Sequence, residues 1–133
     1  MNLIVDTSAA VAVLLREPER DRFRDLLLAS NPGISAGTLV ELLRISAVRK
    51  RRSTSPVWTF LELFSVQVVP VDLDQARLAE EGNLRFGRGR GVPPAVLNFG
   101  DLFSYALARQ LDTPLLFKGD DFGQTDVKSA VSP

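Results

Sequence analysis

Short apolar segments with the length of β-strands alternate along this chain with longer segments that have helical spacing. We expect strands at residues 3–5, 66–71 and 113–117, because these segments are apolar and are followed by turn-forming or helix-starting residues. Strands that are separated by helices indicate a parallel sheet that is covered by helices on both faces. The sequence therefore predicts an α/β fold of three layers, with a central, mostly parallel sheet flanked by helices.

The helical segments are bounded by capping residues, prolines and glycines. We expect helices over residues 9–15, from 17 to a stop at 31–33, from 39 to about 52, over 56–64, from Asp72 or Asp74 to about 86, and from an N-cap at Asn98 to about 111. Residues 34–38 are ambiguous, residues 87–94 form a loop, and Val127 is expected in a last short strand. At 133 residues, we expect the whole chain, 1–133, to be a single domain.

The chain contains no histidine and no cysteine. The commonest general base is thus missing, and zinc sites of the usual kinds cannot form. Hydrolytic chemistry in this chain has to rest on carboxylates, lysine, tyrosine, serine or threonine. Carboxylate oxygens favour hard cations such as Mg²⁺ or Mn²⁺.

Three further features concern the compartment. Cysteine is absent, the first residues lack the basic start of a signal peptide, and no apolar run is long enough to span a membrane. We therefore expect a cytoplasmic protein without a membrane partner.

Several carboxylates follow expected strands or begin expected helices. Asp6 comes directly after the first strand, and Asp120 and Asp121 come directly after the strand at 113–117. Asp101 lies in the first turn of its expected helix, and Glu41 lies in the first turn or two of its own. Because ligands bind outside the carboxyl ends of the strands in open α/β sheets, we expect these acids to converge on one rim. Such a group of carboxylates suits metal-assisted hydrolysis of a phosphodiester.

The same acids also have structural explanations. An Asp before a helix caps it, a Ser/Thr-x-x-Glu pattern forms a capping box, and Asp beside Gly is common in turns. These explanations apply to Asp6, to Thr38 with Glu41, to Asn98 with Asp101, and to Asp120 and Asp121. Their joint placement, in a chain without His or Cys, favours a metal site over four separate structural roles.

Basic residues are unevenly distributed, although the net charge is zero. The run at residues 49–52 suits either the solvated end of a helix or contact with RNA. Arg85, Arg88 and Arg90 border the glycine-rich loop, where a segment that grips a polyanionic substrate is plausible. We assign these three arginines weakly to RNA binding.

Four motifs together resemble those of PIN-domain proteins. The segment Leu-Ile-Val-Asp6-Thr7-Ser8-Ala is similar to the opening of that family, and Val-Glu41-Leu is similar to its second acidic motif. Asn-Phe-Gly-Asp101-Leu-Phe-Ser-Tyr-Ala resembles the third motif. Residues 115–126, which contain Gly-Asp120-Asp121-Phe, resemble the closing motif of VapC-type toxins. The motifs occur in family order and span nearly the whole chain.

This resemblance implies a PIN-like fold and a Mg²⁺- or Mn²⁺-dependent endoribonuclease, the toxin of a type II toxin–antitoxin pair. Carried over by motif, Asp6 and Asp101 would be the principal metal ligands, and Glu41 would complete the site or orient the attacking water. The fourth acid would be Asp120, with Asp121 as the alternative. Thr7 and Ser8 are possible additional residues that hydrogen-bond a ligand carboxylate or a phosphate.

The family also implies an RNA substrate, a homodimer and a cognate VapB-type antitoxin. The alternative in a different class is a non-catalytic RNA- or partner-binding module that has the same fold. Two other α/β phosphotransfer folds fit poorly, because Ser8 stands where a haloacid-dehalogenase-type phosphatase has its second Asp and because the acidic pattern of a receiver domain is not clear. The chemistry alone does not separate RNA from DNA, and the sequence does not identify the RNA target.

Overall fold

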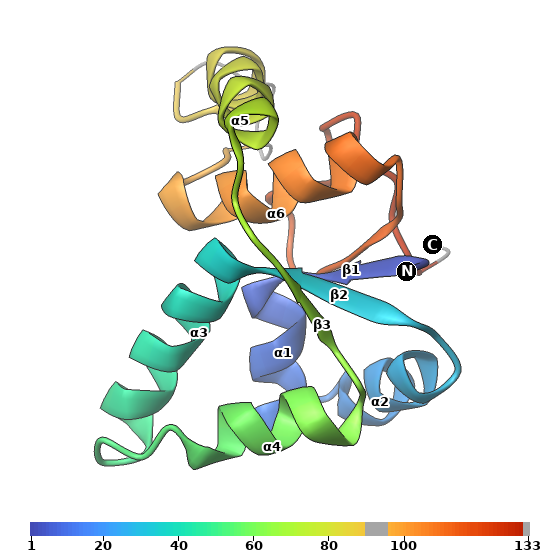
Figure 1. Cartoon of the computed structure of the whole chain (residues 1–133), viewed down its shortest axis with the longest axis vertical. Helices are drawn as coiled ribbons and strands as arrows, with labels where there is room; N and C mark the ends of the chain where they lie inside the picture. The colour runs from blue at the N-terminus through green and yellow to red at the C-terminus, as the bar shows by residue number, and fades with distance from the viewer. Residues whose placement is uncertain (90–95, 132–133) are drawn as a thin grey trace.

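The computed structural model describes residues 1–89 and 96–131, and within these residues the strands form one sheet with the order β3-β2-β1-β4 (Figure 1). The strands are β1 (Leu3–Val5), β2 (Pro32–Ser35), β3 (Gln67–Val69) and β4 (Leu115–Leu116). All three pairings are parallel. The predicted parallel sheet is thus confirmed, and β2 is a strand that was not predicted.

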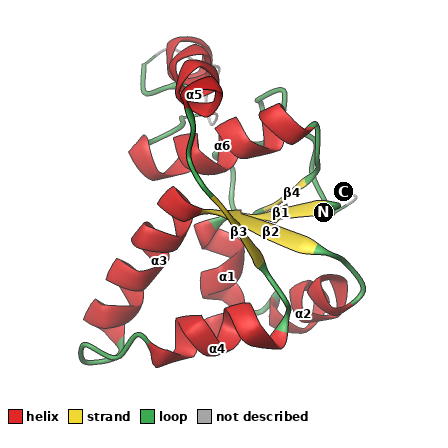
Figure 2. Ribbon diagram, viewed as in Figure 1, coloured by secondary structure: helices red, strands yellow, loops and turns green. Residues whose placement is uncertain are grey.

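The helices lie on both faces of this sheet. They are α1 (Thr7–Leu14), α2 (Arg20–Leu28), α3 (Ala36–Arg49), α4 (Ser55–Leu63), α5 (Leu73–Phe86) and α6 (Phe99–Leu111). Figure 2 shows α1 to α4 on one side of the sheet and α5 and α6 on the other. The three-layer α/β arrangement is confirmed.

The middle strand β1 contributes to two separate cores. Leu3 and Val5 pack into a large apolar cluster with α1 to α4, whereas Ile4 packs into a second cluster with Tyr105 and Leu107 of α6. Successive side chains of a strand point to opposite faces, so three buried residues serve both layers. The two cores thereby hold β1 in place, and they also fix the position of Asp6, which follows it.

The expected helix stop at residues 31–33 was wrong in position. Helix α2 already ends at Leu28, and Pro32 and Gly33 belong to β2. Pro32 is the first residue of this strand, a position where the missing N–H of proline is tolerated. The ambiguous residues 34–38 divide between the end of β2 and the first turn of α3.

The chain end runs beside β4 without forming a regular strand. The N–H of Leu115 donates to the carbonyl of Lys128, and the N–H of Ala130 donates to the carbonyl of Leu115. The expected strand at Val127 is therefore replaced by an isolated bridge between Leu115 and Ser129. Among the described helices, none is both long and apolar enough to cross a membrane.

Candidate active site

Asp6 lies directly after β1 and is the N-cap of α1. It is only 3% exposed, and both carboxylate oxygens accept hydrogen bonds. Oδ2 accepts from the backbone N–H of Ser8 at 3.0 Å and from its hydroxyl at 2.6 Å, and Oδ1 accepts from the hydroxyl of Ser104 at 2.6 Å. Burial raises the pKa of Asp6 above its ordinary value, and the nearby Glu41 carboxylate adds to this rise. Asp6 therefore caps α1, and its hydrogen bonds also fix its carboxylate at the end of β1.

Asp101 lies in the first turn of α6 and forms a capping box with Asn98. The N–H of Asn98 donates to Asp101 Oδ2 at 3.0 Å, and the N–H of Asp101 donates to Asn98 Oδ1 at 2.9 Å. Burial, more than any other cause, raises the pKa of Asp101 to about 8, with Asp121 and Asp6 contributing. The capping box uses Oδ2 of Asp101, while the same carboxylate is close enough to Asp6 and Asp121 for both to raise its pKa.

Glu41 reaches the same place from α3. The hydroxyl of Thr7, in the first turn of α1, donates to Glu41 Oε1 at 2.5 Å. The alternative explanation of Glu41, a capping box with Thr38, was wrong, because α3 begins at Ala36 and Ser35 is its N-cap, accepting from Gly37. Glu41 is therefore in the second turn of the helix, where its side chain caps no backbone group and turns towards α1 and α6.

The fourth acid differs between the two candidates. The Asp121 carboxylate lies close enough to Asp101 to add to the rise in the pKa of Asp101, and Asp121 is half-buried. Asp120 is exposed, and its backbone carbonyl accepts from Gly123 in a turn. Among the described residues, Asp120 is not one of the main influences on the pKa of Asp6 or of Asp101. The structure thus brings Asp121 to the other acids and leaves Asp120 outside.

Hydroxyl groups hold these acids in place. Ser104 also contacts the hydroxyl of Thr38 at 3.1 Å, and Ser8 accepts from the backbone N–H of Lys118 at 3.0 Å. Asp6 is thereby tied through Ser104 to α3 and α6, and through Ser8 to the end of β4. Thr7 and Ser8 were expected near the site, whereas Ser104 and Thr38 were missed. The sequence offered one indication of them: Ser104 lies about one helical turn after Asp101, and Thr38 lies about one turn before Glu41.

The basic residues have separate positions. Arg85 pairs with Glu81 at 3.2 Å and with Asp126 at 3.1 Å, so its charge is used within the chain. Arg88 is exposed, and Arg90 lies outside the described residues. The basic run 49–52 follows the far end of α3, about 20 Å along the helix from its first turn (Figure 1). This run is therefore the solvated end of a helix at a distance from the acids.

The four acids interact in pairs. Among the described residues, no three acidic side chains stand close enough together, as placed, to chelate an ion. The pairs nevertheless connect all four, since Asp6 acts on both Glu41 and Asp101, and Asp101 acts on Asp121. A divalent cation would offset the repulsion among these carboxylates, and an all-oxygen set suits Mg²⁺ or Mn²⁺. The chemistry of the donors thus fits such an ion.

Comparison with known proteins agrees with the α/β fold. The family model described as PIN domain matches residues 3–128. Ribonuclease VapC42 of Mycobacterium tuberculosis (strain ATCC 25618 / H37Rv) is 45% identical over 130 residues, which cover 96% of this chain and 98% of that protein.

Two solved structures have the same fold. The Mycobacterium tuberculosis toxin VapC20, described as cleaving the sarcin–ricin loop, superposes with a TM-score of 0.74 at 20% identity, over 98% of this chain and 99% of that one. VapBC2 from Rickettsia felis, bound to a DNA fragment from the promoter of its genes, gives 0.74 at 15% identity, over 97% of each chain.

Proposed function

Because this chain belongs to the PIN-domain family, we propose that it is a metal-dependent endoribonuclease and the toxin of a VapBC-type toxin–antitoxin pair. Support comes from a relative named as a ribonuclease that is 45% identical over almost the full length of both proteins. The observation that carries the proposal is the pairwise approach of four acids from separate parts of the chain, namely Asp6 with Glu41, Asp6 with Asp101, and Asp101 with Asp121. We take residues 1–133 as one catalytic domain.

Asp6 and Asp101 would hold the Mg²⁺ or Mn²⁺ ion. They are the two most deeply buried acids of the group, and their pKa values are raised. When bound, such an ion lowers the pKa of a water ligand and stabilises negative charge on the scissile phosphate. Asp121, beside Asp101, is the fourth acid in this proposal, in place of Asp120.

The other side chains have roles of orientation and proton transfer. Ser8 and Ser104 hold the two oxygens of Asp6 by hydrogen bonds, so the carboxylate keeps one orientation. The Thr7 hydroxyl keeps one oxygen of Glu41 fixed, and the other is left to accept a proton from the attacking water. Arg88, which is exposed beside the loop after α5, would contact the RNA backbone.

The experiment is RNA cleavage by purified protein and by its Asp6→Asn and Asp101→Asn variants, with Asp112→Asn as the exposed control. We expect both site variants to lose nearly all cleavage and Asp112→Asn to keep it. EDTA should stop cleavage by the wild type, and Mg²⁺ or Mn²⁺ should restore it. Wild-type levels of cleavage in both site variants would contradict the assignment. Sequencing of RNA ends after brief induction then identifies the target.

The antitoxin would occupy the groove between α1, α2 and α4. This groove has a volume of about 490 Å³, and its apolar floor includes Leu14, Phe60 and Leu63. Arg16 lies at its edge, together with Arg20 and Arg24, which also pair with Asp21 and Asp25. An amphipathic segment with acidic residues along one side matches that chemistry. Loss of antitoxin binding in a Leu63→Asp variant that still cleaves RNA would support this placement, and unchanged binding would contradict it.

A homodimer would use the apolar surface beside the acids. Phe99 is 78% exposed and Val40 is 67% exposed, and both line a hollow of about 290 Å³ between α3 and α6. Exposed large apolar side chains grouped in this way favour association. Light scattering should give twice the chain mass for the wild type and a monomer for Phe99→Ser.

A further inference from the structure

The segment that carries Asp121 is tied to α6 by one charged network. Asp126 accepts from the Tyr105 hydroxyl at 2.8 Å through Oδ1, and from Arg109 at 2.7 Å through Oδ2. Arg109 also donates to the Tyr105 oxygen at 2.7 Å, which closes a triangle of three hydrogen bonds. Arg85 of α5 adds a further bond to Asp126 at 3.1 Å. Three elements are thereby joined through a single carboxylate.

The partners of Asp126 are themselves fixed. The Tyr105 ring is fully buried and packs so closely against Gly82 of α5 that a β-carbon there would overlap it. Burial, together with Asp126, raises the pKa of Tyr105 to about 12, so its hydroxyl remains a donor at neutral pH. Arg109 lies over the same ring at 5.6 Å from the centroid. Asp126 is thus attached to a rigid part of α6.

Little freedom remains between Asp126 and Asp121. Phe122 is 2% exposed and packs against Phe117, with ring centroids 5.2 Å apart. The N–H and the hydroxyl of Thr125 both donate to the carbonyl of Phe122, which closes the turn in between. If Asp126 moved, the short turn between the two residues would therefore move Asp121 as well.

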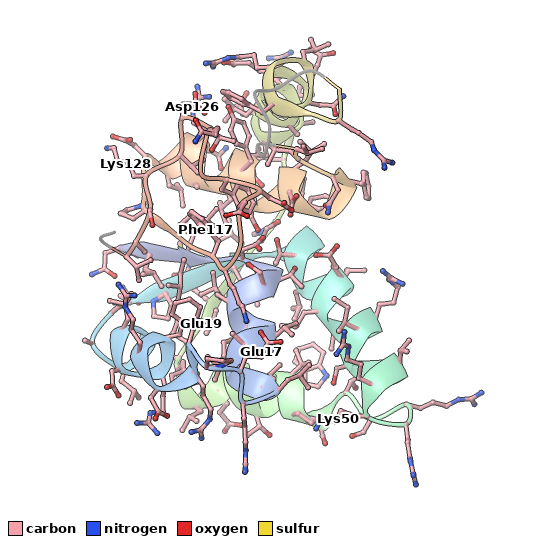
Figure 3. All side chains as sticks on the ribbon, turned by 180° about the vertical axis from the view of Figure 1, so that it is seen from behind. Glu17, Glu19, Lys50, Phe117, Asp126 and Lys128 are labelled. Carbon is pink, nitrogen blue, oxygen red and sulfur yellow. The ribbon has the colours of Figure 1, made fainter. Side chains whose placement is uncertain are left out.

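The other end of the segment is fastened to a different layer. Lys118 pairs with Glu17 at 3.1 Å and with Glu19 at 2.8 Å, in the connection between α1 and α2. Figure 3 labels both ends: Asp126 lies beside α6, and Glu17 and Glu19 lie on the opposite side of Phe117. The acids Asp120 and Asp121 are thus carried on a strap between two ion-paired ends.

We propose that Asp126 is a positioning residue, which holds the strap 118–126 through Tyr105 and Arg109 so that the Asp121 carboxylate stays against Asp101. No hydrogen bond joins Asp126 to Asp6, Glu41 or Asp101 among the described residues, and in this proposal its effect reaches the acids by way of the strap and Asp121. This inference rests on the proposed function only for its kinetic consequence. The placement of Asp121 beside Asp101 and the resulting affinity for a divalent cation do not depend on the substrate.

The central variant is Asp126→Asn in the full chain, which keeps the size of the side chain and removes its charge. We expect faster amide hydrogen exchange at residues 119–125 and Mn²⁺ binding about tenfold weaker by calorimetry. With RNA as substrate, kcat should fall about tenfold while KM changes less than twofold. Tyr105→Phe removes only one donor to Asp126. It should change amide exchange, Mn²⁺ affinity and kcat in the same direction as Asp126→Asn, but to a smaller extent.

The matched control is Asp112→Asn, which breaks the exposed ion pair with Lys128 at 3.0 Å, close to the strap in sequence. It should leave exchange, Mn²⁺ affinity and kcat at wild-type values. The double variant Asp121→Asn/Asp126→Asn should be no worse than Asp121→Asn alone, because the proposal has Asp126 act by way of Asp121.

Two results would overturn the proposal. One is an Asp126→Asn variant with the exchange and Mn²⁺ affinity of Asp112→Asn. The other is a double variant whose loss equals the product of the two single losses. If the wild type cleaves no RNA, the proposed function fails, whereas the exchange and Mn²⁺ measurements still decide whether Asp126 positions Asp121.

Discussion

Glu41 of α3 lies directly over Gly100 of α6, at a place where a β-carbon on residue 100 would overlap its carboxylate. The reciprocal contact lies nearby, since the ring of Phe103 covers Gly37 in the same way. Each helix thus offers a glycine to a side chain of the other. This close crossing brings Glu41 to the first turn of α6, beside Asp101, and makes the glycines part of the site's geometry.

Gly100→Ala is expected to destabilise the fold, although Ala normally favours a helix by a few tenths to about 1 kcal/mol over Gly. The physical reason is the overlap with Glu41, which would have to move away. In a Glu41→Ala background the same substitution should instead raise Tm, because the obstruction is gone. Thermal unfolding of the wild type, the two single variants and the double variant tests this prediction. A fall in Tm of equal size in both backgrounds would contradict the prediction.

Thr7→Val should lower RNA cleavage about tenfold with little change in Tm. Valine keeps the shape of threonine but removes the hydroxyl that holds Glu41 Oε1 at 2.5 Å. Thr7→Ser retains the donor and serves as the control, with cleavage within about threefold of wild type. Equal losses in the two variants would mean that packing, and not the hydrogen bond, matters at this position.

The adjacent acids Asp120 and Asp121 form a natural matched pair. Asp121→Asn should reduce cleavage at least tenfold, since its carboxylate interacts with Asp101. Asp120→Asn should change cleavage by less than about twofold, since its side chain is exposed and outside the group of acids. Kinetics with one RNA substrate compares them. The reverse order of effects would return the role of fourth acid to Asp120.

The metal-free protein should become less stable as pH rises from about 4 to about 8. Burial raises the pKa of Asp101 from an ordinary 3.8 to about 8, so in this window the folded state holds a proton that the unfolded state has released. The free energy of unfolding must then fall with increasing pH, and the raised pKa of Asp6 acts in the same direction.

Unfolding in EDTA at about pH 5.5 and about pH 8 measures this dependence. Asp101→Asn has no such proton and should show a flatter profile. Mg²⁺ should oppose the trend, because it binds the ionised carboxylates that become available at higher pH. A Tm that rises with pH in EDTA, in the wild type but not in Asp101→Asn, would show that the sign is wrong.

Much of the fold follows from local patterns. The apolar segment before Asp6 and the cap at Asn98 were placed correctly, because a buried strand and a capped helix leave a clear local signal. The strand β2 was missed, since Pro32 and Gly33 indicate a turn unless a neighbouring strand is known. Its central place between β1 and β3 depends on pairings with distant residues.

The candidate site likewise has residues that the sequence indicated and residues whose contacts only the fold revealed. The acids could be named from their position after strands and in first helical turns. The local explanation of Glu41 was wrong, because the cap at Ser35 starts the helix three residues earlier than Thr38. Arg85 was expected to bind RNA, and only the fold showed its pairs with Glu81 and Asp126.

The sequence by itself determined which side chains are available for chemistry: four motifs of acids and hydroxyls, and no His or Cys. The tertiary structure decided which of them meet. Ser104 reaches Asp6 across 98 residues, and Asp121, not its neighbour, faces Asp101. The physical reason is that strand and helix signals are local in the chain, whereas contacts between side chains depend on how distant elements cross and pack.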